Sequence, residues 1–183
     1  MELVRPAARH LEQYVSALRQ GWSPNPLSDQ TRLDELERIE QGPARFLDEQ
    51  VDREAKGPSI LLPDGTTVAR LPGFRLWMWD SEFCGSISLR WQPGTAELPP
   101  HCLGHVGYSV VPWKRKRGYA TRALGLLLPL AEQEGLPYVE ITTDVGNVAS
   151  RRVVEANGGK LVETFRKPAM YGGAESLRFR IEL

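Results

Sequence analysis

The sequence predicts a single α/β domain over residues 1–183, with a central mixed β-sheet flanked by helices. Three observations predict this fold class. Apolar residues recur at helical spacing over residues 7–54, alternate as in strands over 73–111, and then follow both patterns in turn. A chain of 183 residues, 41% hydrophobic and 25% charged, is long enough for one hydrophobic core and short for two.

The first 60 residues are predicted to be mainly helical. The expected elements are a strand at 2–5 and helices at 7–19, 29–39 and 44–54. Apolar residues at positions 8, 11, 15 and 18 make one hydrophobic face on the first helix. Two prolines in SPNPLSD separate it from the second helix, which Ser28 or Asp29 can cap, and Gly42-Pro43 precedes the third.

The rest of the chain is predicted to alternate between strands and helices. The expected strands are 73–80, 83–91, 103–111, 138–143, 160–165 and 176–181, and the expected helices are 117–134 and 148–156. Pro63-Asp64-Gly65 marks a turn before the first of these strands. Gly104 and Gly107 lie inside a strand, which indicates a bulge or a close approach of the backbone by a ligand.

Composition excludes several classes of protein. The chain has 23 Lys and Arg against 23 Asp and Glu, so a nucleic-acid binder held by a basic surface is disfavoured. The longest apolar run is far below the ~20 residues of a membrane helix, and the first residues lack the apolar segment of a secretion signal. Two cysteines fit a reduced compartment. We therefore expect a cytoplasmic protein with no nucleic-acid or membrane partner.

The segment GHVGYSVVPWKRKRGYATRALGLLL carries the most information about function. It predicts a strand, a basic turn at residues 114–117, and a helix that begins after Gly118. Such a turn directs unpaired backbone N–H groups and the positive end of a helix dipole at one point, which favours an anion. Gly118 lets the backbone approach the anion, and the small Ala120 leaves room for it. A plain basic surface turn is the alternative interpretation.

These residues resemble the signature of the GNAT acyltransferase superfamily, Arg/Gln-x-x-Gly-x-Gly/Ala between a strand and a helix. Arg115, Gly118 and Ala120 match it. Downstream, the strand at 138–143, Asn147-Val148-Ala149-Ser150 and Asn157-Gly158-Gly159 are similar to elements of many members, in the same order. The resemblance covers residues 104–165 well, 73–92 moderately and 1–60 hardly at all.

The resemblance implies acetyl-CoA as the co-substrate, bound in a cleft where two neighbouring strands splay apart. It implies that backbone groups of Val110 and Val111 bind the pantetheine arm, and that Asn147 bonds its amide region. The residues implied around the pyrophosphate are Arg115, Lys116, Arg117, Gly118, Tyr119, Ala120 and Thr121. Arg151 or Arg152 can reach the adenosine phosphates or simply face solvent.

The resemblance also implies direct transfer of the acetyl group to a primary amine. His105 is the candidate base, since its ordinary pKa near ~6.5 suits proton transfer at neutral pH, and a hydrogen-bonded structural histidine is the other interpretation of this residue. Glu82 and Glu140 are the alternative bases. Ser150 is the candidate that interacts with the thiolate. Many relatives carry a Tyr where this chain has Val154, so Tyr108 and Tyr171 compete for that role. A non-catalytic acyl-CoA-binding module is the alternative to an enzyme.

The expected acceptor is a small-molecule or peptide amine, approached from the helical side formed by residues 1–60. Nine acidic and four basic residues between 29 and 54 favour a cationic acceptor, because such a surface attracts cations. Trp77, Trp79 and Trp91 are either core residues or an aromatic wall of the acceptor pocket. We expect no metal site. The resemblance is compatible with a homodimer, because many members of the family form dimers.

His101, Cys102, His105 and Cys84 can be drawn as a zinc set. However, the His-x-x-x-His spacing suits a helix, and this stretch is predicted to be loop and strand.

Overall fold

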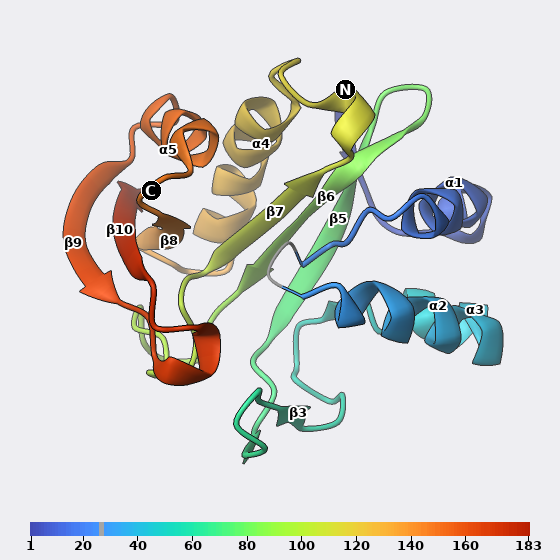
Figure 1. Cartoon of the computed structure of the whole chain (residues 1–183), viewed down its shortest axis with the longest axis horizontal. Helices are drawn as coiled ribbons and strands as arrows, with labels where there is room; N and C mark the ends of the chain where they lie inside the picture. The colour runs from blue at the N-terminus through green and yellow to red at the C-terminus, as the bar shows by residue number, and fades with distance from the viewer. Residues whose placement is uncertain (26–27) are drawn as a thin grey trace.

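The computed structural model describes residues 1–25 and 28–183 (Figure 1). Its elements are β1 (Glu2–Val4), α1 (Ala8–Arg19), α2 (Gln30–Gln41), α3 (Pro43–Asp48), β2 (Val51–Asp52), β3 (Ile60–Leu61), β4 (Thr67–Val68), β5 (Gly73–Trp79), β6 (Phe83–Arg90), β7 (Val106–Val110), α4 (Tyr119–Gln133), β8 (Tyr138–Asp144), α5 (Val148–Glu155), β9 (Lys160–Arg166) and β10 (Glu175–Glu182). Short 3₁₀ turns cover Pro112–Lys114 and Ala169–Tyr171. The mixed α/β class is confirmed. Pro26, one of the prolines expected to break the first two helices, lies outside the described residues.

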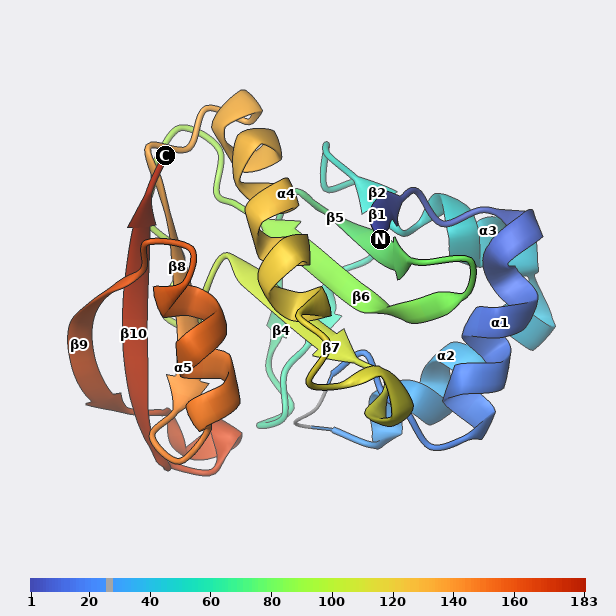
Figure 2. The ribbon, with the colours of Figure 1, turned by 90° about the horizontal axis from the view of Figure 1, so that it is seen from above.

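Most of the described strands form two antiparallel sheets in place of one continuous mixed sheet, and β3 and β4 pair separately as a two-stranded sheet. The larger has the order β1-β5-β6-β7, with β2 also paired to β5, and the smaller has the order β8-β10-β9. Their facing edge strands meet at one end, where the His105 N–H donates to the Glu140 carbonyl at 2.8 Å. From there β7 and β8 diverge, as Figure 2 shows. The predicted splayed strand pair is therefore β7 and β8.

Helices cover the larger sheet on both faces. Helix α4 packs on one face, where Ile87, Leu124, Leu127 and Val139 belong to the main core, and α5 packs beside α4 against β8 of the smaller sheet. Helices α1, α2 and α3 lie on the other face (Figure 1), over a second cluster that is rich in aromatic rings. Its centre is Tyr14 stacked on Trp77, with ring centroids 4.4 Å apart. Aromatic burial of this kind anchors α1 to the sheet.

The structure differs from expectation at the third helix. The helix predicted over 44–54 ends at Asp48, and Val51 and Asp52 pair with β5 as a short strand. The side-chain amide of Gln50 donates to the Phe46 carbonyl, and the Gln50 carbonyl accepts from the N–H of Arg75 at 2.7 Å. Val51 and Asp52 therefore pair with the edge of β5 instead of extending the helix. The Pro63-Asp64-Gly65 turn is confirmed, since it joins β3 to β4.

Candidate active site

The turn between β7 and α4 leaves a run of backbone donors free. Lys116 and Gly118 have φ values of +62° and +77°, and Gly118 is the N-cap of α4. The first bond into the helix comes from Arg122 to the Gly118 carbonyl. Within residues 1–25 and 28–183, the six N–H groups from Lys116 to Thr121 donate to no protein acceptor. A helix start with unpaired donors is favourable for an anion.

Most of the basic side chains of this turn have no acidic partner. Arg115, Lys116 and Arg117 are exposed, and none forms an ion pair in the described part of the chain. Arg115 donates through Nε to the Val110 carbonyl at 3.2 Å, which holds it beside the end of β7. Lys114 differs, because its ammonium pairs with Glu82. Three of the four cations in the KRKR run therefore stay available to an anionic ligand.

Strand β7 presents a free backbone edge to the gap between the sheets. The His105 carbonyl accepts from the Arg90 N–H, and the Val111 N–H donates to the Cys84 carbonyl. Because bonding alternates along an antiparallel strand, the N–H and C=O groups of Tyr108 and Val110 point away from β6. Val110 thus fits its expected role at a ligand.

The same register corrects the expectation for Val111. Its N–H bonds Cys84, its carbonyl accepts from the Lys114 N–H, and its side chain is fully buried. Val111 has no free polar group for a pantetheine arm, and it belongs to the core under α1.

Tyr108 and Ser150 bridge the two halves of the site. The Tyr108 hydroxyl lies 2.7 Å from the Ser150 hydroxyl, across the gap from β7 to α5. Burial raises the pKa of Tyr108, so the phenol is a proton carrier rather than an anion at neutral pH. Asn147 caps α5 by accepting from the Ser150 N–H at 3.0 Å, and its side chain is exposed. Asn147 and Ser150 therefore sit together at the start of α5.

Tyr119 contributes its backbone rather than its ring to the turn. Its hydroxyl donates to Asp80 at 2.7 Å, at the β5–β6 hairpin, and this bond raises the pKa of Tyr119 to about 12. Ala120 and Thr121 follow it in the first turn of α4 and offer N–H groups to the same point.

His105, the candidate base, is buried and hydrogen-bonded. Its side chain is fully buried, its Nδ1 accepts from the Glu140 N–H at 2.9 Å, and its Nε2 is buried with no hydrogen-bond partner in the described residues. Burial lowers its pKa below the ordinary value. The ring packs edge-on against Tyr138 with centroids 6.0 Å apart. His105 therefore joins β7 to β8 through the Glu140 N–H, and its role as a base stays a prediction.

The alternative catalytic groups are also occupied. Glu140 pairs with Arg180 at 2.8 Å, and Glu82 pairs with Lys114. The Tyr171 hydroxyl donates to the His101 carbonyl at 2.9 Å. Trp77 and Trp91 are core residues, so no aromatic wall forms from them. Among the residues that the structure describes, no three or more His, Cys, Asp or Glu side chains gather as in a metal site.

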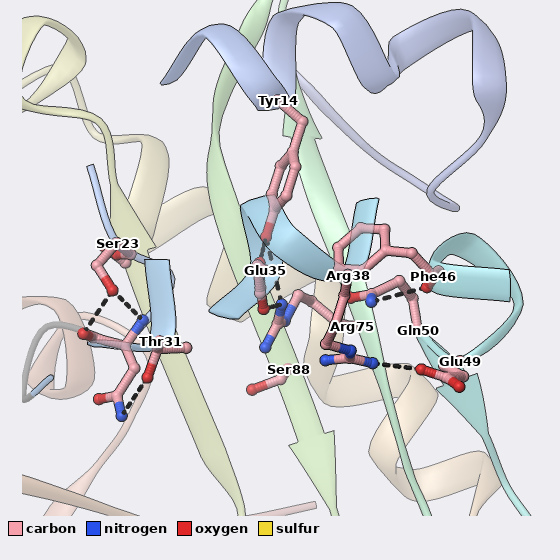
Figure 3. Close-up of polar contacts among 12 residues, drawn as sticks. Tyr14, Ser23, Thr31, Glu35, Arg38, Phe46, Glu49, Gln50, Arg75 and Ser88 are labelled. Carbon is pink, nitrogen blue, oxygen red and sulfur yellow. Dashed lines mark hydrogen bonds and ion pairs between the residues drawn. The ribbon is translucent and has the colours of Figure 1, made fainter. Parts of the chain in front are cut away.

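The acidic stretch at residues 29–54 is partly neutralised. Its paired acids are Asp29 with Arg32, Glu35 with Arg75, Glu49 with Arg38 and Arg45, Asp52 with Arg70, and Glu54 with Lys56. Three of these partners, Lys56, Arg70 and Arg75, come from outside the stretch. Figure 3 shows the buried Glu35 held between Tyr14 and Arg75, and Glu49 beside Arg38. Five of the nine acids are therefore paired, whereas Asp34, Glu37, Glu40 and Asp48 form no ion pair among the described residues, and the cationic acceptor stays a prediction.

A row of polar residues crosses the larger sheet on the side of α1 and α2. Two of its residues, Ser88 and Arg90, were not predicted from the sequence. Arg75, Ser88 and Gly107 are consecutive partners across β5, β6 and β7, and all are half-buried. Arg90 follows on the same face. Its Nη2 and the Ser88 Oγ would each lie 3.5 Å from a Cβ built on Gly107. The available signal was the alternation of Ser86, Ser88 and Arg90 in an otherwise apolar strand.

Comparison with known proteins identifies the family. The profile of the "Acetyltransferase (GNAT) domain" family matches residues 3–160, whereas no curated protein matches the chain in sequence. No helix in the described residues is long and apolar enough to cross a membrane.

Three solved structures share the fold at low identity. RimJ of Mycobacterium smegmatis, in complex with a CoA disulfide, has a TM-score of 0.63 at 16% identity, over 98% of this chain and 80% of that chain. RimL, a ribosomal L7/L12 alpha-N-protein acetyltransferase in complex with coenzyme A, has 0.62 at 12%, over 99% and 93%. The microcin C7 self-immunity acetyltransferase MccE, in complex with acetyl-CoA and AMP, has 0.61 at 15%, over 99% and 91%. Since the family profile covers most of the chain, the protein belongs to the GNAT acetyltransferase family, whose enzymes use acetyl-CoA as co-substrate.

Proposed function

We propose that this protein is an N-acetyltransferase that moves the acetyl group of acetyl-CoA directly to a primary amine. The observation that carries the proposal is the run of six unpaired N–H groups from Lys116 to Thr121, beside three unpaired cations. That arrangement fits a pyrophosphate, whose charge is stabilised by helix N-termini and by arginine. The free cysteines Cys84 and Cys102 fit action in the reduced cytoplasm.

Each side of the gap between the sheets has a proposed task. The N–H and C=O groups of Tyr108 and the N–H of Val110 bond the pantetheine arm, and the exposed side chain of Asn147 bonds its amide region from α5. Arg151, whose Nε is buried with no partner in the described residues, is placed to meet an adenosine phosphate. These contacts together hold the thioester against the free edge of β7.

The chemistry then needs an oxyanion donor, a neutral amine and a proton for the leaving thiolate. A free N–H of β7 donates to the thioester oxygen as negative charge develops there. As the C–N bond forms and the C–S bond breaks, the hydroxyl of Ser150, bonded to Tyr108, relays to the leaving sulfur the proton that the attacking nitrogen loses, and both hydroxyls end as they began.

No strong base is required for an amine of low pKa. An α-amino group titrates near ~7.7–8.0, so a useful fraction is already neutral at physiological pH. RimL is named for α-N-protein acetylation, and this proposal places α-amines among the acceptors to be screened here.

A matched pair of variants at Gly118 tests the cofactor assignment. Gly118→Asn and Gly118→Asp have the same size and both tolerate the left-handed backbone of this position. A Cβ there meets nothing within 4 Å, so the fold is expected to persist in both. The carboxylate of the Asp variant opposes a phosphate and should weaken acetyl-CoA binding at least about 10-fold more than the amide does.

Calorimetry measures the affinity, and release of free thiol from acetyl-CoA with a panel of amines measures the activity. Equal affinities of the two variants would contradict a phosphate at this turn. Tight binding without thiol release for any amine would contradict the transfer activity alone.

A further inference from the structure

The buried and half-buried Lys and Arg side chains of the described chain fall into two groups, those that form an ion pair with a carboxylate and those that do not. The Lys and Arg residues that are at least half-buried in the described chain are Arg32, Arg70, Arg75, Arg90, Lys114, Arg151, Lys167, Arg178 and Arg180. Seven of them form an ion pair with a carboxylate. The two without one are Arg151 and Arg90. Removing a guanidinium from water without a partner is costly, so each of these two positions calls for an explanation.

Arg151 already has an explanation in the proposed function, because it lies on α5 next to Asn147 and Ser150. Arg90 lies elsewhere, at the end of β6, on the same face of the sheet as Arg75 and Ser88. Its Nη1 donates a long hydrogen bond to the Cys102 sulfur at 4.0 Å, and its Nη2 lies over Gly107. No carboxylate among the described residues pairs with it.

Arg90 is the one cation of this polar row without a carboxylate partner among the described residues. Arg75, on the same polar row, gives one guanidinium nitrogen to the buried Glu35 at 2.6 Å, and Ser88 lies beside it in Figure 3. Gly107 has no side chain, so nothing from β7 covers the space over which Arg90 and Ser88 reach. The same strand presents the free edge of Tyr108 and Val110 to the proposed thioester. A molecule lying over Gly107 therefore reaches both Arg90 and the reacting edge of β7.

We propose that the acceptor carries an oxyanion, a carboxylate or a phosphate, which Arg90 binds while the amine of the same molecule lies at β7. This inference rests on the proposed function and names the substrate class of that site. A planar guanidinium binds either oxyanion through paired N–H donors, so both sources share one chemistry. It is an alternative to the cationic acceptor predicted from the acidic stretch.

Matched acceptors test the proposal with Arg90→Gln and Arg90→Lys as variants. The pairs are β-alanine with β-alaninamide, Ala-Asp-amide with Ala-Asn-amide, and O-phosphoethanolamine with ethanolamine. In the wild type, kcat/KM should favour the anionic member about 10- to 100-fold, the range of a charged hydrogen bond. Arg90→Gln should remove this preference, Arg90→Lys should retain part of it, and the KM for acetyl-CoA should not change in either.

The three pairs also distinguish a carboxylate acceptor from a phosphate acceptor. For a carboxylate acceptor the preference should appear in the β-alanine and Ala-Asp-amide pairs, and for a phosphate acceptor in the O-phosphoethanolamine pair. Arg19→Gln, at an exposed arginine of α1 that forms no ion pair in the described structure, is the control and should change nothing. Equal use of both members by the wild type, or an equal loss for both in Arg90→Gln, would overturn the proposal while leaving acetyl transfer intact.

A binding measurement keeps the proposal testable if no amine is turned over, which would count against the proposed function instead. Inorganic phosphate is titrated into the CoA-loaded protein at constant ionic strength, and the side-chain ¹⁵N resonances of the arginines are followed. The resonance that disappears in Arg90→Lys should shift saturably, and that of Arg19 should not. A response of Arg90 that is absent or no different from that of Arg19 would overturn the proposal.

Discussion

His105 shows how one buried residue changes the pH dependence of stability. Burial lowers its pKa in the folded chain below the value near ~6.5 of an unfolded histidine, so the unfolded state binds the proton more tightly. Its contribution to stability is therefore complete above pH ~6.5 and is lost as the pH falls below that value. Between pH 7.5 and 5.5 the protein should lose stability through this residue, by at most about 1 kcal/mol, a limit set by protonation of the unfolded histidine.

Replacing His105 with Gln keeps a hydrogen-bond acceptor near the Glu140 N–H but removes the titration. Urea unfolding at the two pH values should then show that much less pH dependence than the parent. The comparison belongs in a His10→Gln background, because burial lowers the pKa of His10 as well. If the variant instead loses about 100-fold in kcat/KM with unchanged pH-dependent stability, His105 is the base after all.

At the residue scale, the sequence predicted what depends on local backbone and missed what depends on distant partners. Gly118 and its neighbours were predictable, because a strand, a basic turn and a helix start are consecutive in the chain. The burial of His105 depends on β8, which lies 35 residues further on. Arg90 forms no ion pair among the described residues, and this depends on where the carboxylates lie in the folded chain. A local sequence pattern does not indicate those positions.

At the scale of elements, the contact between β7 and α5 is the one that bears on catalysis. Ser150→Ala should lower kcat about 10- to 100-fold with little change in acetyl-CoA affinity, because the lost hydroxyl acts on the leaving sulfur. Tyr108→Phe should cost less, since it removes only the partner that orients Ser150 at 2.7 Å. Single-turnover kinetics with calorimetry separates these effects. Ser16→Ala, on the exposed side of α1, is the control. An unchanged kcat in Ser150→Ala would make the pair purely structural.

Most elements were predictable from periodicity, and the exceptions have a common cause. The strands β5, β6, β8 and β10 follow alternating or β-rich segments, and α1 and α4 follow helical spacing. The helix expected over 44–54 was too long, because the edge of β5 recruits Val51 and Asp52. The division into two sheets was likewise not visible, since strand pairing is set by contacts between segments far apart in the chain.

At the scale of the whole molecule, the two sheets touch through His105 and Glu140 and are bridged again by Tyr108 and Ser150. A ligand bound to the turn after β7 and to α5 adds further links between them. It should stabilise the fold by mass action, about 2.7 kcal/mol at a free concentration of 100 Kd.

The pattern of that stabilisation distinguishes a ligand between the sheets from one on the surface. Hydrogen exchange with and without CoA should show protection of the N–H groups at residues 116–121 and along the free edge of β7, because the ligand supplies their missing acceptors. Helices α2 and α3 lie on the opposite face of the larger sheet and should exchange as before (Figure 1). The Gly118→Asp variant should lose the protection at the turn. Protection confined to α2 and α3, or absent from residues 116–121, would place the cofactor elsewhere and remove the anion site on which the proposed activity depends.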